Sequence, residues 1–154
     1  MRRPISSLRL ARWERAATPL PFCEYLIDLV RPHAVLWVCR GSFYERNNKR
    51  FGLDLWGVER DARQYSGPGP IIAHPPCGPW GRLAWSSTED RGHGVRAMEL
   101  VHQCGGVVEQ PDGSQLFKQH GRDGATILKV DQFDYGHRAL KPTLLYIWRV
   151  HCGL

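Results

Sequence analysis

The chain has 154 residues, the usual size of one globular domain. Hydrophobic residues make up 42% of it and charged residues 23%, which excludes a fully disordered protein. No run of residues approaches the roughly 20 apolar positions of a membrane-spanning helix. The basic start, residues 1–4, also lacks the apolar run of a secretion signal. We therefore expect no membrane association and a cytoplasmic location.

The charge balance favours an anionic partner. Lysine and arginine number 21 against 15 acidic residues, a formal net charge of +6. Phosphate contacts reward Arg and Lys, so DNA is the partner we expect. Residues 1–21 form a basic arm in which Arg2 and Arg3 are candidates for phosphate contact. A soluble protein that is merely basic, with a solvated tail, is the alternative.

The cysteines indicate neither a disulfide framework nor a zinc site. There are five, an odd number, and none belongs to a Cys-x-x-Cys pair. The two short His/Cys pairings, His74 with Cys77 and His102 with Cys104, lack zinc-finger spacing. We therefore expect a reducing compartment and no bound metal.

The elements predicted in chain order alternate between helices and strands. They are a helix over residues 22–30, a strand over 34–39, a helix over 43–50, a strand over 53–58, a turn over 66–70, a strand over 71–73, a helix over 95–104, a strand over 107–109, a helix over 114–120 capped by Ser114, and closing strands over 125–130 and 143–150. This alternation predicts an α/β fold, with one domain over residues 22–154.

Chemically versatile side chains gather where the predicted strands end. These strand ends carry Arg40-Gly41-Ser42, Glu59, His74 to Cys77, and Glu109-Gln110-Pro111. Ligands bind beyond the carboxyl ends of strands in open α/β sheets. We therefore expect a thiol and a carboxylate on neighbouring loops of one site.

Three motifs resemble those of DNA cytosine-5 methyltransferases. Residues 72–77 with Trp80 resemble the strand-to-loop Pro-Pro-Cys motif, and residues 107–111 are similar to the strand that delivers Glu-Asn, with Gln110 in place of Asn. Residues 132–143 are similar to the Gln-x-Arg-x-Arg element before a final strand. The order agrees over residues 54–150, and the chain looks most like the short methyltransferase-like proteins of phages and prophages.

The resemblance implies an open Rossmann-like, methyltransferase-type sheet in a single three-layer domain. It also implies S-adenosylmethionine as cofactor, with Gly41, Glu59 and Pro75 as the cofactor-binding residues. The setting would be a bacterial or phage-infected cell. Because 154 residues leave little room beyond such a sheet, we expect specificity to come from a protein partner, a homodimer or the arginine-rich start.

The resemblance also implies the residues of the reaction. Cys77 would be the nucleophile on carbon 6 of a pyrimidine swung out of the duplex, Glu109 would bind the base, and Arg138 or Lys141 would supply a cation. The residues expected to contact nucleic acid, besides Arg2 and Arg3, are Trp80, Arg82, Gln132 and His137.

Plainer interpretations stay open for most of these residues. Cys77 is alternatively a structural thiol, Glu109 a strand terminus and His74 a hydrogen-bonding loop residue; Trp80 and Trp85 are alternatively packing residues, and Gln132, His137, Arg138 and Lys141 part of a solvated loop. The corresponding alternative functions are a catalytically silent relative that binds nucleic acid or protein, and an enzyme that modifies a free pyrimidine nucleotide.

Overall fold

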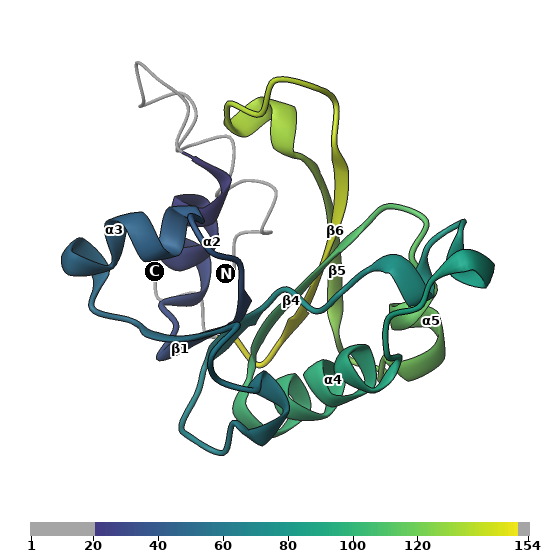
Figure 1. Cartoon of the computed structure of the whole chain (residues 1–154), viewed down its shortest axis with the longest axis horizontal. Coiled ribbons are helices and arrows are strands. Elements are labelled where there is room, and N and C mark those ends of the chain that lie inside the picture. The colour runs from purple at the N-terminus through teal and green to yellow at the C-terminus, as the bar shows by residue number, and fades with distance from the viewer. Residues whose placement is uncertain (1–20, 151–154) are drawn as a thin grey trace.

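The computed structural model describes residues 21–150 (Figure 1). The helices are α2 (Phe22–Val30), α3 (Phe43–Phe51), α4 (Gly92–Cys104) and α5 (Leu116–His120). The strands are β1 (Ala34–Val38), β2 (Asp54–Gly57), β3 (Ile71–Ala73), β4 (Gly106–Pro111), β5 (Thr126–Asp131) and β6 (Pro142–Trp148). Short 3₁₀ turns are η1 (Ala62–Gln64), η2 (Gly78–Trp80), η3 (Ala84–Ser86) and η4 (Gln132–Tyr135). Every predicted helix and strand is therefore confirmed, with small shifts of its ends.

All of these strands belong to one mixed sheet in the order β2-β1-β3-β4-β6-β5. Strands β2, β1, β3 and β4 run parallel, whereas β6 runs antiparallel to both of its neighbours. The prediction of an α/β fold is confirmed. Strands β1 and β3 and the first half of β4 are buried on both faces, which explains why they read as short continuous apolar runs, whereas the edge strand β2 is half-buried.

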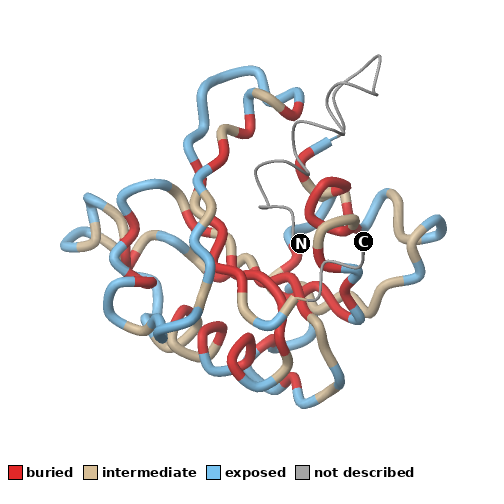
Figure 2. Tube along the Cα trace, turned by 180° about the vertical axis from the view of Figure 1, so that it is seen from behind, coloured by how far each residue is buried: buried red, intermediate tan, exposed pale blue. Residues whose placement is uncertain are grey.

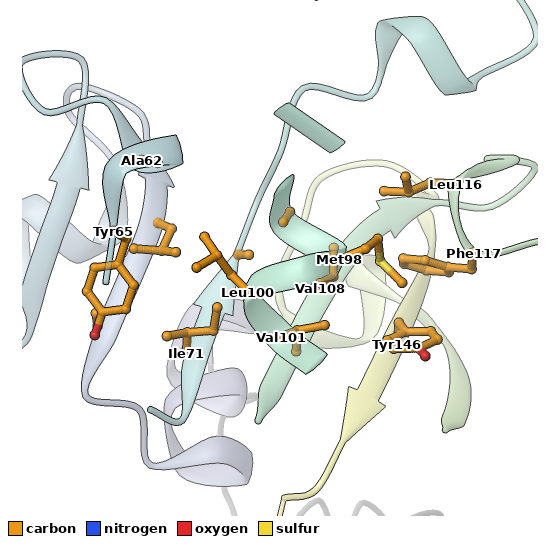
Figure 3. Close-up of a cluster of buried hydrophobic side chains, with 14 of the residues drawn as sticks. Ala62, Tyr65, Ile71, Met98, Leu100, Val101, Val108, Leu116, Phe117 and Tyr146 are labelled. Atoms are coloured by element: carbon orange, nitrogen blue, oxygen red, sulfur yellow. The ribbon is translucent and has the colours of Figure 1, made fainter. Parts of the chain in front are cut away.

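Helices cover both faces of the sheet. Alternate strand residues point to opposite sides, and both sets are apolar here, so each face needs a covering layer. On one face Leu36, Ala73 and Val108 pack with residues of α4 and α5; Val108 is labelled in Figure 3 with Met98 of α4 and Leu116 of α5. On the other face Val35, Ile72 and Val107 pack with residues of α2. The central strands of the sheet form the buried centre of the trace in Figure 2. Three layers result, as expected.

The central strands approach closely at one glycine. Gly106, the first residue of β4, has φ +132°, and a Cβ there would overlap the carbonyl oxygen of Ile71 on β3. Only glycine allows this backbone conformation and this approach. The close pairing of β3 with β4 brings together the two loops of the site.

The predicted cap of the helix over 114–120 is displaced. Helix α5 begins at Leu116, and Gln115 stands at its N-cap position without a side-chain capping bond. The Ser114 hydroxyl accepts from the N–H of Leu116 at 3.3 Å and donates to Gln110 Oε1 at 3.0 Å. Ser114 therefore links α5 to strand β4.

Candidate active site

The candidate site lies at β1, where the chain changes from adding strands on one side of the sheet to adding them on the other side. Strands β2 and β3 flank β1 on opposite sides, so the two successive crossovers run in opposite directions. In open α/β sheets the carboxyl ends of the strands at such a point bind ligands. Residues 39–42 follow β1 here and residues 74–77 follow β3, as the strand-end pattern led us to expect.

A carboxylate and an imidazole meet at this edge. Val108 on β4 is in register with Ala73 on β3. The residues that come next in the chain, Glu109 and His74, are therefore neighbours at this edge of the sheet. His74 Nδ1 lies 3.1 Å from Glu109 Oε2, and the two side chains are only 19% and 15% exposed. Glu109 therefore has a specific partner and does more than end a strand.

The other nitrogen of His74 contacts helix α3. The hydroxyl of Tyr44 lies 2.9 Å from His74 Nε2, and Tyr44 is 3% exposed. Burial, followed by the nearby Cys23, raises the pKa of Tyr44 well above its ordinary value. Burial also raises the pKa of Cys23, although a hydrogen bond with Tyr44 opposes it. Both groups therefore keep their protons near neutral pH.

Glu109 is held as a carboxylate. Burial raises its pKa, but the hydrogen bond with His74 and the charges of His74 and Lys141 outweigh burial and hold the pKa below its ordinary value. An ionised carboxylate only accepts hydrogen bonds. At neutral pH this edge of the sheet therefore presents a negatively charged acceptor.

The loop that carries Cys77 is fixed through its carbonyls. Pro75 and Pro76 have no N–H, so the backbone there can only accept. Gln110 Nε2 donates to the Pro75 carbonyl at 2.9 Å, and Gln110 is 1% exposed. The Cys77 carbonyl accepts from the N–H of Trp80 at 3.0 Å, and the Cys77 thiol is exposed. Sequence reasoning treated Gln110 only as a replacement for Asn and missed this role.

Two residues expected to contact nucleic acid belong to the interior instead. Trp80 is 2% exposed, and its ring lies 4.6 Å from the Arg91 guanidinium, so stacking on a base does not fit its position. Gln132 is 7% exposed and donates to Thr143 Oγ1 at 3.0 Å. The interpretation of Trp80 as a packing residue is confirmed.

The loop before β6 brings one cation, Lys141, near enough to Glu109 to affect its pKa. His137 is exposed, and its Nδ1 accepts from the N–H of Ala139 at 3.2 Å, which stabilises a turn. Arg138 and Lys141 are both exposed. The charge of Lys141 lowers the pKa of Glu109, whereas no ion pair joins Arg138 to Glu109.

Arg82 is exposed, and its charge lowers the pKa of Asp112 on the loop after β4, although the bond from Lys129 does more. Arg2 and Arg3 lie outside the described residues.

The three residues expected to bind a cofactor differ in their availability. Gly41 has φ +69° with open space where a Cβ would stand, and its N–H donates to Glu45 Oε2 at 2.7 Å. Glu59 is 84% exposed and pairs with Arg40 at 3.1 Å. Pro75 is buried, and its carbonyl is occupied by Gln110.

An exposed tryptophan follows the Cys77 loop. Trp85 is 84% exposed and Leu83 is 67% exposed, both around η3. The interpretation of Trp85 as a packing residue is wrong, because nothing in the described structure covers its ring. Two tryptophans five positions apart thus have opposite environments, which residue type alone cannot reveal.

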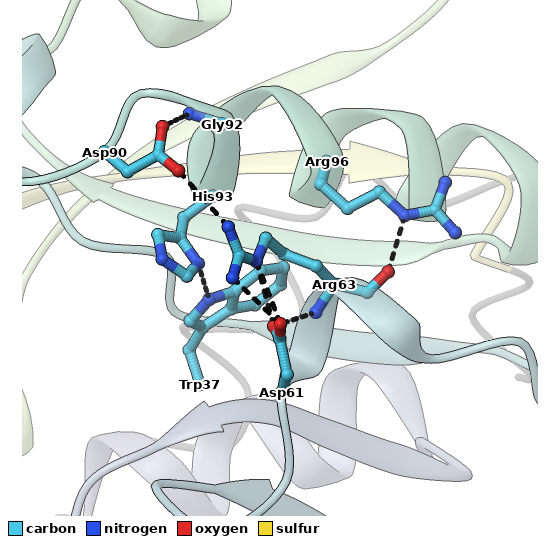
Figure 4. Close-up of polar contacts among 7 residues, drawn as sticks. All are labelled: Trp37, Asp61, Arg63, Asp90, Gly92, His93 and Arg96. Carbon is cyan, nitrogen blue, oxygen red and sulfur yellow. Dashed lines mark hydrogen bonds and ion pairs between the residues drawn. The ribbon is translucent and has the colours of Figure 1, made fainter.

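A bulge in β1 was also missed. Trp37 has φ +59°, rare for a bulky residue, at the register shift between Leu36 and Val38. Its Nε1 donates to His93 Nδ1 at 3.0 Å (Figure 4). Beside this pair, Arg63 bridges Asp61 and Asp90, at 2.9 and 3.2 Å. The start of α4 is thereby tied to the ends of β1 and β2.

Compared with models of protein families, with curated proteins and with solved structures, the chain shows no significant match. Within residues 21–150, no three or more His, Cys, Asp or Glu side chains group in a way that suits a metal ion. No helix in the same range has the length and apolar character needed to cross a bilayer.

Proposed function

We propose that this chain is a reduced DNA (cytosine-5) methyltransferase-like protein in which Cys77 is the nucleophile and Glu109 binds the base. One arrangement carries the proposal. Glu109 lies in the second half of β4, and the next residue on that strand, Gln110, holds the carbonyl of Pro75 two positions before Cys77. Strand β4 thus carries the acceptor for the base, Glu109, and also fixes the loop after the adjacent strand β3 that carries the nucleophile, Cys77.

The residue types suit addition to a pyrimidine ring. Cys77 is exposed, and in such an addition the thiolate form of a cysteine is the attacking species. Its sulfur forms a bond to C6, the C5–C6 π bond breaks, and the electron pair moves to C5, where an electrophile can take it up. Once C5 has taken up an electrophile, loss of its proton to solvent re-forms the C5–C6 π bond and expels the thiolate, whereas without an electrophile the addition simply reverses. Glu109 accepts from the exocyclic amine, and Lys141 offsets the negative charge that develops.

S-adenosylmethionine, when bound, would supply the methyl group that C5 receives. Gly41 and Glu59 fit the role of holding it, since they follow adjacent strands, with open space at Gly41 and an exposed carboxylate at Glu59. The Arg40–Glu59 pair is solvent-exposed, and such pairs contribute only about 0–1 kcal/mol, so a ligand can replace Arg40. Pro75 does not fit the role, because its carbonyl is already bonded to Gln110.

Duplex DNA is the substrate we propose. A target base must leave the stack before a thiol can reach C6. The segment just after Cys77 presents Arg82, Leu83 and Trp85 to solvent, a cation and two apolar side chains suited to a phosphate and to an opened stack. The net charge of +6 supports the same substrate.

The proposal extends to architecture and setting. A methyltransferase-type Rossmann-like sheet is supported by four parallel strands whose order reverses beside β1. The described residues hold one sheet and its covering helices, without a second module for reading DNA sequence. We also propose that a second copy, a protein partner or the arginine-rich start of the chain supplies specificity, in the cytoplasm of a bacterial or phage-infected cell.

A covalent trap tests the proposal. The full chain is incubated with S-adenosylmethionine and duplex DNA containing 5-fluorocytosine, whose fluorine blocks release of the enzyme, and the adduct is measured by denaturing electrophoresis and mass spectrometry. We expect an adduct with the wild type and with Cys104→Ser, a control because Cys104 is a free cysteine at the end of α4, just before β4 begins and away from the site. We expect none with Cys77→Ser.

Two results would overturn the proposal. An adduct that survives Cys77→Ser means that another group is the nucleophile. Binding of DNA without any adduct in the wild type favours the catalytically silent relative. Calorimetry with S-adenosylmethionine tests the cofactor separately, and Glu59→Ala should weaken its binding.

A further inference from the structure

The partners of Glu109 form a chain of side chains from three elements. His74 contacts Glu109 through Nδ1 and Tyr44 through Nε2, at 3.1 and 2.9 Å. Tyr44 is in turn hydrogen-bonded to Cys23 on α2. The backbone N–H of His74 donates to the Leu36 carbonyl at 3.1 Å, so the ring stands on a backbone that the sheet fixes.

The donor in the Glu109–His74 contact follows from chemistry. A carboxylate accepts only, so Nδ1 of His74 carries the hydrogen in this bond, whether the ring is neutral or charged. The Tyr44 hydroxyl holds Nε2, donating to a neutral ring or accepting from a charged one. This contact fixes the ring orientation, and the ring in turn fixes Glu109 Oε2.

We propose that His74 and Tyr44 are positioning residues that hold Glu109 as a fixed acceptor and thereby select a pyrimidine with an exocyclic amine. This inference rests on the proposed function, since it concerns the base that Glu109 receives. A cytosine presents an N–H donor to the carboxylate. A uracil or thymine presents a carbonyl oxygen at the same place, and two acceptors facing each other repel.

Two other charged groups lie near Glu109, His74, Tyr44 and Cys23, and each lowers the pKa of at least one of them. Lys141, from the loop before β6, lowers the pKa of Glu109, and Arg46 of α3 lowers that of Cys23. Neither group replaces the hydrogen bond from His74. Loss of that bond leaves burial as the main influence, so Glu109 takes up a proton more readily and becomes able to donate to a carbonyl oxygen.

Two substitutions of one residue separate positioning from folding. In His74→Asn the amide nitrogen stands near the place of Nδ1 and keeps a donor toward Glu109. In His74→Gln the amide nitrogen stands near the place of Nε2, so this variant keeps the contact with Tyr44 and loses the donor toward Glu109. Tyr44→Phe removes only the hydroxyl. All three variants keep a side chain of similar shape in the same space.

The first measurement needs no DNA. Titration of the Glu109 carboxyl carbon by NMR, assigned with Glu109→Gln, should show the pKa of Glu109 rising most in His74→Gln and less in His74→Asn and Tyr44→Phe. Equal pKa values of Glu109 in His74→Gln and in the wild type would show that His74 does not hold Glu109, whatever the protein does to DNA.

The second measurement compares adducts with 5-fluorocytosine and 5-fluorouracil duplexes over a range of pH. The ratio of the two rates should fall roughly tenfold in His74→Gln, in keeping with the loss of a site group that pairs with the amine. His74→Asn should keep most of the ratio. An unchanged ratio and pH profile in His74→Gln would overturn the inference and leave the proposed function standing. Absence of any wild-type adduct would instead overturn the proposed function.

Discussion

Glu109 occupies an environment with two opposed influences. Burial favours the protonated carboxyl, whereas His74 and Lys141 favour the carboxylate, and the second influence prevails. A group whose pKa is lower in the folded than in the unfolded chain binds fewer protons when folded. It therefore stabilises the fold above its unfolded pKa, and this contribution is lost as the pH falls through the folded pKa.

Glu109→Gln makes this linkage measurable. Urea unfolding of the wild type and of the variant should give a difference in unfolding free energy that is constant near neutral pH. The difference should shrink as the pH falls below the ordinary carboxyl value of 4.5. A difference that does not change across this range would mean that Glu109 has no lowered pKa in the fold.

The meeting of His74 with Glu109 was only partly predictable. Their strand ends were expected on neighbouring loops, because apolar runs marked both strands. The bond itself depends on the register of Ala73 with Val108 and on the close approach at Gly106, which arise from packing. Tyr44 was unpredictable for the same reason, since a tyrosine on a polar helix carries no sign of its partner.

At the scale of elements, the segment between Cys77 and α4 is split between interior and surface. Trp80 on η2 packs against the first turn of α4, where a Cβ at Gly94 would overlap its ring. Trp85 on η3 has no such neighbour and stays exposed. The helices and strands followed from periodicity, but this split depends on one glycine of another element.

Trp85→Ala should weaken binding to duplex DNA. Stacking of an aromatic ring on a base is worth about 1–3 kcal/mol, roughly 5- to 150-fold in affinity. The unfolding free energy should barely change, because the ring is exposed. Fluorescence anisotropy with labelled DNA measures the effect. Val58→Ala serves as control, since Val58 is 73% exposed and follows β2 instead. Equal affinities of both variants would remove η3 from the DNA interface.

At the scale of the whole molecule, the positive charge distinguishes a polymer from a nucleotide as partner. Only a polymer releases many condensed counterions on binding. The logarithm of the DNA affinity should fall linearly with the logarithm of salt concentration, with a slope near −0.9 for each phosphate contacted. Titration at several salt concentrations measures this slope. A weak dependence, like that of a free cytidine nucleotide measured in parallel, would favour a nucleotide-modifying enzyme.

The arrangement of the sheet also bears on how the protein is made. Strand β6 follows β5 in the chain but lies between β4 and β5. During synthesis β5 therefore emerges before β6, the one strand with which it pairs within residues 21–150, and the outer edge of β4 stays open meanwhile. We expect the parallel half, with Cys77 and Glu109, to pair before β6 completes the sheet. The environment of Glu109 is completed later, when Lys141 and β6 arrive.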